Sequence, residues 1–216
     1  MPRDATTTRT AIMDAAEALI LDHGFAGTSI DRVIRKAGIT KGTFFYYFGS
    51  KADLGLALVR RFADLDRRQL EDNMDRAERL SRDPLQQVLI FIGLFREAAD
   101  ELAEPYPGCL FASYIHEAQL FDDQTLEVIR RAMTAWRDRL GGKLREVMEH
   151  YPSRLAVDPD ALADMITVLF EGAFILSKTL REPKVIARQL DHYRAYLELL
   201  FAPEVGRERP APGTAG

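Results

Sequence analysis

Five aromatic residues stand in a row from Phe44 to Phe48, within the stretch GITKGTFFYYFGSK at residues 38–51. They make up a quarter of the 12 Phe, 7 Tyr and 1 Trp of the chain. Lysines stand on both sides of the row, at Lys41 and Lys51. Tyrosine hydroxyls and lysine ammonium groups are common partners of the phosphate oxygens of nucleic acids. The chemistry that this stretch favours is therefore contact with a phosphate backbone.

Two short helices joined by a glycine turn are predicted to position these side chains. The sequence TSID makes Thr28 the predicted N-cap of the first helix, with Asp31 as the acidic partner in a capping box. Gly38 ends this helix, and Thr40 caps a second helix over residues 41–48. This is the layout of a helix-turn-helix, whose second helix can enter the major groove of DNA.

The spacing within the aromatic row divides it between two faces of the second helix. Phe44 and Phe48 are four residues apart, so they share one face and are predicted to pack into the core. Tyr46 and Tyr47 point elsewhere, which leaves their hydroxyls available to a phosphate. Phe45 lies between the two faces.

The charge of the chain is also concentrated around this row. The whole chain has a net charge of −4, whereas residues 29–51 hold five Lys or Arg and one Asp. Lys41 and Lys51 each begin a predicted helix, where the helix dipole disfavours a cation but favours a bound phosphate. Solvated lysines beside half-buried tyrosines are the alternative interpretation. The caps and the glycine turn, taken together with the charge, favour DNA.

The stretch TSIDRVIRKAGITKGTFFYYFGSKADL resembles the DNA-binding domain of the TetR/AcrR family of bacterial transcriptional regulators. The resemblance runs from about Thr8 to Leu58. It implies an all-α two-fold dimer, with an N-terminal three-helix helix-turn-helix domain and a larger helical domain that binds a ligand and dimerises. Phe45 stands where the family usually has a tyrosine, which removes one phosphate contact. The positions implied to contact DNA are Thr28, Thr40, Lys41, Gly42, Thr43, Tyr46, Tyr47 and Lys51.

Three segments are predicted along the chain. Residues 1–50 form the helix-turn-helix domain, residues 51–202 the helical regulatory and dimerisation domain, and residues 203–216 a disordered tail. The connecting helix is predicted to start at Lys51, with Ser50 as its N-cap.

Helices are also predicted throughout the second domain. An Asp followed by Pro starts two of them, at residues 83–84 and 158–159, and Pro183 is predicted to begin the last. Gly141 and Gly142 permit a bend in the long helix between.

The last two helices are apolar on more than one face, which indicates two packing partners. One is the core of the chain, and the other is predicted to be the same pair of helices from a second subunit. Burial within the monomer is the alternative. The predicted dimer residues are Ile166, Phe174, Tyr193, Leu197 and Leu200.

A ligand pocket in this domain would draw on its large aromatic residues, although each of them could instead be plain core. The polar His116 and Lys178 stand in the same stretches. No His, Cys and Asp cluster has metal-binding spacing, so no metal or other cofactor is predicted. The aromatic candidates are Phe91, Phe95, Phe111, Tyr114, Trp136, Phe170 and Phe174.

Cys109 is the single cysteine, which excludes an intramolecular disulfide. It follows Pro107 and Gly108 at the start of a predicted helix, where the dipole is expected to lower the pKa of the thiol. The sequence GCLFAS resembles a subset of the family whose cysteine at this place senses electrophiles or oxidants. A small buried core residue is the alternative.

Several other classes of protein are disfavoured by the sequence. No apolar run reaches the length of a transmembrane helix, and the N-terminus lacks the layout of a signal peptide, so a cytoplasmic protein is predicted with no membrane partner. No Ser-His-Asp arrangement, phosphate-binding Gly loop or paired carboxylate stands out, so no enzyme is predicted. A helical interaction module or helical enzyme with an unused helix-turn-helix remains the alternative. The prediction is a homodimeric repressor, released from a two-half-site DNA operator by a small-molecule inducer or by modification of Cys109.

Overall fold

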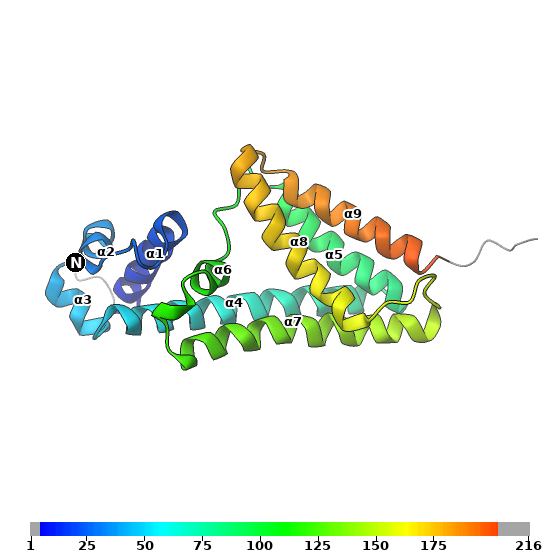
Figure 1. Cartoon of the computed structure of the whole chain (residues 1–216), viewed down its shortest axis with the longest axis horizontal. Helices are drawn as coiled ribbons and strands as arrows, with labels where there is room; N and C mark the ends of the chain where they lie inside the picture. Colours follow the sequence, from blue (N-terminus) through cyan, green and yellow to red (C-terminus); the bar gives the residue numbers. More distant parts are fainter. Residues whose placement is uncertain (1–4, 203–216) are drawn as a thin grey trace, which may run out of the picture.

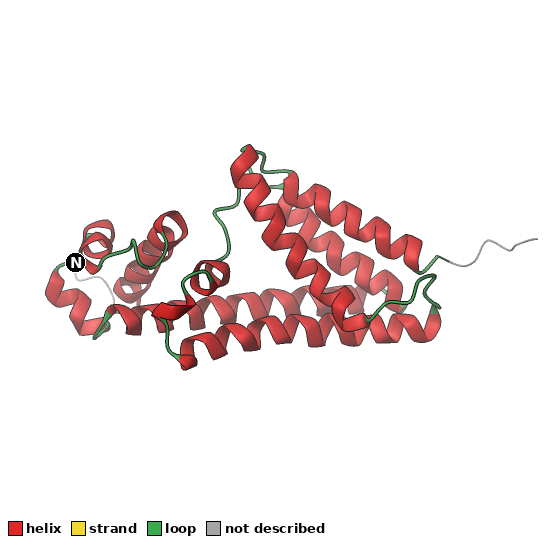
Figure 2. Cartoon of the chain, viewed as in Figure 1, coloured by secondary structure: helices red, strands yellow, loops and turns green. Residues whose placement is uncertain are grey.

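The computed structural model describes residues 5–202, and within them it contains helices and loops but no β-strand (Figures 1 and 2). The predicted all-α fold is thereby confirmed, while the predicted tail at residues 203–216 lies outside the described residues. Three helices gather at one end of the molecule (Figure 1), namely α1 (Ala5–His23), α2 (Ile30–Ala37) and α3 (Lys41–Tyr47).

Two long helices connect this end to the rest of the molecule. Helix α4 (Lys51–Leu80) leaves the N-terminal helices and lies beside α7 (Asp123–His150) along the length of the molecule (Figure 1). Helix α5 (Pro84–Asp100) packs against both of them. The N-terminal helices are therefore connected to α4, and the same long helix also contributes to the C-terminal core.

Helices α8 (Pro159–Leu180) and α9 (Val185–Leu200) pack against each other and cover α7 and α5, respectively. The short α6 (Leu110–Ile115) and the 3-10 turn η1 (Ala118–Leu120) follow α5 and lie close to α1 and α4. This segment brings the middle of the sequence to the N-terminal helices.

Most predicted helix starts are confirmed by their capping bonds. The side chains of Thr40, Ser50 and Asp83 accept hydrogen bonds from backbone N–H groups in the first turns of α3, α4 and α5. The predicted N-cap at Thr28 is wrong, because Ser29 accepts the N–H of Arg32 instead.

One further detail of the prediction differs from the structure, since the last helix starts at Val185 rather than at Pro183. Helix α7 runs through Gly141 and Gly142 as one continuous helix, as predicted for this segment. A Cβ atom on Gly141 would lie 2.5 Å from an Asp160 carboxylate oxygen, which shows that this glycine allows close approach of the start of α8.

The buried apolar side chains form two clusters. The N-terminal cluster includes Ile12, Val33, Phe44 and Phe48, which confirms that the two phenylalanines pack inward. It also contains residues of α6, such as Tyr114, and residues of the first half of α7. The second cluster joins α4, α5, α7, α8 and α9. Both clusters include residues of α4 and α7, so these two helices link the N-terminal cluster to the second cluster.

Candidate functional site

The outer face of α3 carries the residues predicted to contact DNA. Tyr46 is 80% exposed, and Thr40, Lys41 and Gly42 are exposed beside it. Phe45 is 44% exposed, which agrees with its predicted place between the two faces. These side chains therefore form a continuous surface at the N-terminus and along one side of the helix.

Two predicted contact residues on α3 are only partly accessible. The Thr43 hydroxyl is 2.8 Å from the hydroxyl of Thr40, and the Thr43 N–H donates to the same Thr40 oxygen at 3.1 Å. Tyr47 packs on the N-terminal core, and its ring meets that of Tyr46 edge-on at a centroid distance of 4.9 Å. Both side chains are held in place by neighbours of the same surface.

Thr28 and Lys51 are directed toward the protein rather than away from it. Thr28 is 3% exposed, and its hydroxyl donates to the Gly24 carbonyl at 2.9 Å, which leaves no oxygen at the surface for a phosphate. The Lys51 ammonium donates to the Phe25 carbonyl at 2.5 Å and lies 4.3 Å from the centre of the Phe25 ring. Burial lowers the pKa of this ammonium group, although the charge of Glu117 opposes the effect.

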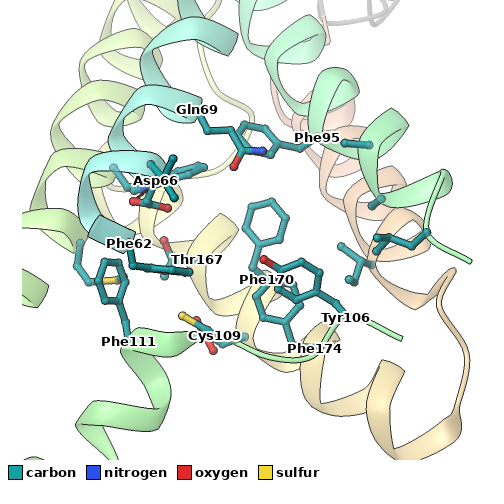
Figure 3. Close-up of a pocket in the computed structure, with 18 of the residues that line it drawn as sticks. Phe62, Asp66, Gln69, Phe95, Tyr106, Cys109, Phe111, Thr167, Phe170 and Phe174 are labelled. Carbon is teal, nitrogen blue, oxygen red and sulfur yellow. Dashed lines mark hydrogen bonds between the residues drawn. The ribbon is translucent and has the colours of Figure 1, made fainter. Parts of the chain in front are cut away.

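A cavity of about 450 Å³ opens between α4, α5, α7, α8 and the loop before α6 (Figure 3). Its size is within the range of small-molecule sites, about 300–1,000 Å³. Six of the ten residues predicted for a ligand pocket line it: Phe95, Cys109, Phe111, Trp136, Phe170 and Phe174.

The other four predicted pocket residues lie outside the cavity wall. Phe91 is buried behind Phe95 and Trp136, at ring distances of 5.1 and 6.0 Å. Tyr114 is fully buried and donates its hydroxyl to the Gly55 carbonyl at 3.0 Å.

His116 and Lys178 are both exposed. His116 is the C-cap of α6. The Lys178 ammonium lies 3.4 Å from the carbonyl oxygens of Leu21 in α1 and of Pro107 in the loop before α6. Lys178 therefore stands between α8, the cavity loop and the N-terminal helices rather than inside the cavity.

Sequence reasoning missed several residues of the cavity wall. Phe62 and Asp66 lie one turn apart on α4, Tyr106 lies in the loop before α6, and Glu17 and Glu171 reach the wall from α1 and α8. The only signal available for Phe62 and Asp66 was their i, i+4 spacing within a helix rich in charge.

Burial shifts the acids of the cavity. It raises the pKa of Asp66 to about 6, although the Trp136 indole N–H donates to its carboxylate at 2.8 Å and opposes the shift. Burial also raises the pKa of Glu171, while a hydrogen bond from the Cys109 thiol lowers it. Both carboxylates line a cavity whose wall is rich in aromatic side chains.

The expectation that the thiol pKa of Cys109 is lowered is wrong. Burial and the nearby charge of Glu171 raise it to about 12. Backbone N–H groups at the start of α6 favour the thiolate, but this helix has six residues, and their effect is outweighed. Cys109 is therefore a protonated thiol that donates a hydrogen bond to Glu171.

Four of the five predicted dimer residues are buried within the protomer. Ile166, Tyr193, Leu197 and Leu200 belong to the C-terminal core, so they are not available to a second subunit. Phe174, the fifth, is half-buried in the cavity wall. The monomer-burial alternative is correct for these positions, because it is the opposite sides of the two helices that reach the surface.

Other apolar side chains of α8 and α9 are exposed. Val168 is 68%, Ile175 65% and Leu199 65% exposed, and Leu176 is also exposed. Val168 and Ile175 are seven residues apart, so they lie on the same face of α8. These four residues are called the α8–α9 surface below.

The segment of α6 and η1 contacts the loop between α1 and α2. The Glu117 carboxylate accepts the N–H groups of Phe25 at 2.8 Å and of Ala26 at 2.7 Å. The Phe25 ring packs against Tyr114 and Phe121, at centroid distances of 5.6 and 4.5 Å. The chain that follows the cavity residue Cys109 is thus fixed directly to the N-terminal helices.

Residues 5–202 contain no group of three His, Cys, Asp or Glu placed to hold a metal ion. Over the same residues, no helix has the length and apolar character needed to cross a membrane.

Comparisons with known proteins agree with this architecture. Residues 12–58 match the bacterial regulatory proteins of the tetR family, and residues 84–193 match the tetracyclin repressor-like C-terminal domain. The chain belongs to the TetR family. It is a DNA-binding transcriptional regulator, in a family whose members bind operator DNA as dimers and respond to small molecules.

Individual relatives are distant but cover most of the chain. The chain is 26% identical over 177 residues to the transcriptional regulator AcuR of Cereibacter sphaeroides, covering 81% of this chain and 78% of AcuR. It is 21% identical over 189 residues to the HTH-type transcriptional repressor NemR of Escherichia coli K12, covering 87% and 92% of the two chains. A TetR-family regulator from Agrobacterium tumefaciens has the same fold, with a TM-score of 0.72 at 21% identity, covering 92% of this chain and 100% of that one. These relatives are regulators rather than enzymes.

Proposed function

We propose that the protein is a repressor that binds an operator with two half-sites as a homodimer and leaves it when a small molecule occupies the cavity. The observation that carries this proposal is the chain between Tyr106 and Phe121. Its first part lines the cavity, and its last part holds the loop that precedes the helix-turn-helix. One short segment therefore connects a ligand site to a DNA-reading surface.

The DNA contacts proposed are those that the surface of α3 makes available. Lys41 and Tyr46 are exposed and offer an ammonium group and a hydroxyl, while Gly42 lets a phosphate approach the start of α3 closely. Thr43 and Tyr47 support them from half-buried positions, and the Thr40 side chain already caps the helix.

Lys51 and Thr28 are assigned a supporting role in place of direct contact. Lys51 bonds the Phe25 carbonyl, and Thr28 bonds the Gly24 carbonyl, so both fix the loop between α1 and α2. A boundary between the helix-turn-helix domain and the regulatory domain near residue 50 is consistent with this division of roles.

The homodimer is proposed to form through the α8–α9 surface. Large exposed apolar side chains on one face are the usual sign of a protein interface. A two-fold dimer would present two copies of α3 to half-sites about 34–36 Å apart. The proposed interface thus contains the exposed residues Val168 and Leu199 instead of Tyr193 and Leu197, which were predicted from the sequence but are buried.

Release is proposed to follow from movement of the loop that contains Tyr106 and Cys109. A ligand that fills the cavity displaces or repositions these side chains, and the chain through Glu117 passes the shift to Phe25. Only a difference in ligand affinity between the DNA-bound and free arrangements is required. Covalent modification of Cys109 is the less favoured trigger, since its thiol is protonated and hydrogen-bonded.

The proposal is tested by selecting DNA duplexes from a random-sequence library with the full-length protein. We expect an inverted repeat whose two halves are about one helical turn apart. Recovery of unrelated sequences, or of a single half-site bound by a monomer, would overturn the proposed mode of binding. The selected operator then serves in every binding measurement described below.

A further inference from the structure

The walls of the cavity carry charge of one sign. Glu17 from α1, Asp66 from α4 and Glu171 from α8 reach it, and the described residues that line it include no Lys, Arg or His. An ordinary helical core would exclude carboxylates or pair each of them with a cation. The charge of this cavity therefore constrains the kind of molecule it can hold.

Two of the three carboxylates accept hydrogen bonds only from neutral groups, although the charge of His116 also acts on Glu171. Glu17 is bound by the Arg61 guanidinium at 2.6 Å. Asp66 instead receives the indole N–H of Trp136, and Glu171 receives the thiol of Cys109. Within residues 5–202, neither Asp66 nor Glu171 forms a salt bridge with a basic side chain. A partly buried carboxylate without a salt bridge is destabilised by the loss of water.

Much of the remaining wall consists of aromatic rings, beside aliphatic residues such as Leu102 and Met133. Tyr106 stacks on Phe174 at 4.6 Å, and Phe174 stacks on Phe170 at 6.0 Å. Phe170 also meets Phe95 at 5.6 Å, and Phe95 meets Trp136 at 5.3 Å. Ring faces carry negative charge density and attract organic cations, most strongly when water is excluded. Figure 3 shows Asp66 and Cys109 on one side of the space and the rings of Tyr106, Phe170 and Phe174 on the other.

We infer that the cavity binds a lipophilic organic cation, an amine or quaternary ammonium compound with an aromatic or branched apolar body. This inference rests on the proposed function, since it names the ligand class of the same site. The cation would lie between Asp66 and Glu171, and its apolar body would contact the stacked rings. A neutral ligand leaves both carboxylates unpaired, and an anion is repelled by them.

The test uses the fluorescence of Trp136, the single tryptophan of the chain, which forms part of the wall. Three probes of similar shape are titrated into the full-length protein: benzyltrimethylammonium, its neutral isostere 2,2-dimethylpropylbenzene, and the anion phenylacetate. We expect the cation to bind at least tenfold more tightly than either of the others. Equal binding of the neutral isostere, tighter binding of phenylacetate, or no saturable quenching by the cation would each overturn the inference.

Variants identify the carboxylates responsible. Glu171→Gln and Asp66→Asn keep the shape of each side chain, and Asn keeps an acceptor for the Trp136 indole. Each is expected to weaken cation binding about fivefold to tenfold, with little effect on the neutral isostere. Asp72→Asn, at an exposed position of the same helix as Asp66, serves as the control. Calorimetry replaces fluorescence for Asp66→Asn, because that change alters the surroundings of the indole.

The outcome of the cation-binding test can be distinguished from the outcome of the test of the proposed function. Operator selection measures DNA binding without any ligand, whereas Trp136 quenching measures the cavity without DNA. An operator-binding protein whose cavity rejects cations would overturn the ligand class alone. A protein that binds cations but selects no operator would overturn the proposed repressor and keep the ligand class.

Discussion

The carboxylate of Glu117 accepts a hydrogen bond from the backbone N–H of Phe25 at 2.8 Å, across 92 residues of sequence. The second oxygen accepts the N–H of Ala26 at 2.7 Å, so the loop between α1 and α2 is held by two bonds to one charged group. Charged acceptors form stronger hydrogen bonds than neutral ones. This contact links the segment that follows the cavity residues directly to the loop before the helix-turn-helix.

Removing this carboxylate should loosen the loop locally. In Glu117→Ala the amides of Phe25 and Ala26 lose their acceptor, and we expect their hydrogen exchange to be about tenfold faster, which corresponds to roughly 1.4 kcal/mol. Gly24→Ala should act in the same direction. Its Cβ would lie 2.4 Å from the Glu117 oxygen, and the backbone φ of +74° disfavours any side chain.

The measurement is peptide-resolved hydrogen exchange in the free protein. Glu104→Ala, at an exposed position in the loop before α6, is the matched control and should leave the exchange of residues 24–28 unchanged. Unaltered protection in Glu117→Ala would show that packing of the Phe25 ring alone holds the loop.

The second prediction concerns the exposed face of α3, which is the proposed DNA-binding surface. Lys41→Ala should weaken operator binding and reduce the slope of log affinity against log salt by about 1, because one phosphate contact is lost. Titration of labelled operator at several salt concentrations measures both quantities. Arg79→Ala removes an exposed positive charge near the end of α4, far from α3, and should leave the slope as it is. An unchanged slope in Lys41→Ala would place the phosphate contacts elsewhere.

The third prediction concerns assembly through the α8–α9 surface. Ile175→Glu places a charge on an exposed apolar residue, so it should convert the dimer to a monomer without unfolding the protomer. Sedimentation measures the mass, and loss of the dimer should abolish tight operator binding. Leu80→Glu changes another exposed apolar residue, outside α8 and α9, and should remain dimeric. A dimeric Ile175→Glu protein would move the interface to another face.

Local sequence signals predicted the framework well. The caps at Ser50 and Asp83 need only a side-chain oxygen and an N–H three residues later, so both are visible in the sequence. The division of the aromatic row also follows from helix spacing, because Phe44 and Phe48 share a face. The cap predicted at Thr28 is instead formed by its neighbour Ser29, and Thr28 is buried.

Features that depend on distant contacts could not be predicted in this way. Glu117 is one acid among many in the sequence, and its role follows only from its contact with Phe25. Asp66 and Glu171 meet at the cavity across more than a hundred residues of chain. Leu197 and Leu199 are both apolar, and only the packing of α9 shows that the first is core and the second is surface.

The fourth prediction concerns the reactivity of Cys109. With its pKa raised to about 12 by burial and Glu171, the thiolate population at pH 7 should be about three orders of magnitude below that of an unperturbed thiol. Reaction with N-ethylmaleimide, followed by mass spectrometry, should therefore be slow. Glu171→Gln removes the negative charge that opposes the thiolate and should accelerate the reaction, while Asp72→Asn should not. Wild-type modification as fast as that of free glutathione would contradict the assignment of Cys109 as a half-buried, protonated thiol.

The last prediction concerns the pH dependence of cation binding, and Asp66 sets its sign. Burial raises its pKa to about 6 in the free protein, so at pH 5 most of this carboxyl is protonated and at pH 7 most of it is ionised. A cation favours the ionised form, and its binding therefore releases a proton whenever the pH is near or below 6. Glu171, which faces the same space from α8 and whose pKa burial also raises, adds to the effect in the same direction. Tyr106 and Cys109 also line the cavity, but both have pKa values raised further above neutrality and stay protonated throughout this range.

The affinity for benzyltrimethylammonium should accordingly fall by about tenfold or more from pH 7 to pH 5 and become nearly constant above pH 7. Calorimetry at matched ionic strength measures this dependence, and repeating it in buffers of different ionisation enthalpy counts the protons released. Asp66→Asn should flatten the profile to the smaller dependence that Glu171 leaves, because an amide has no proton to release in this range. Glu17 also faces the cavity, where it is paired with Arg61. An affinity that is constant from pH 5 to pH 7, or that rises as the solution becomes more acidic, would show that the cation does not bind beside Asp66.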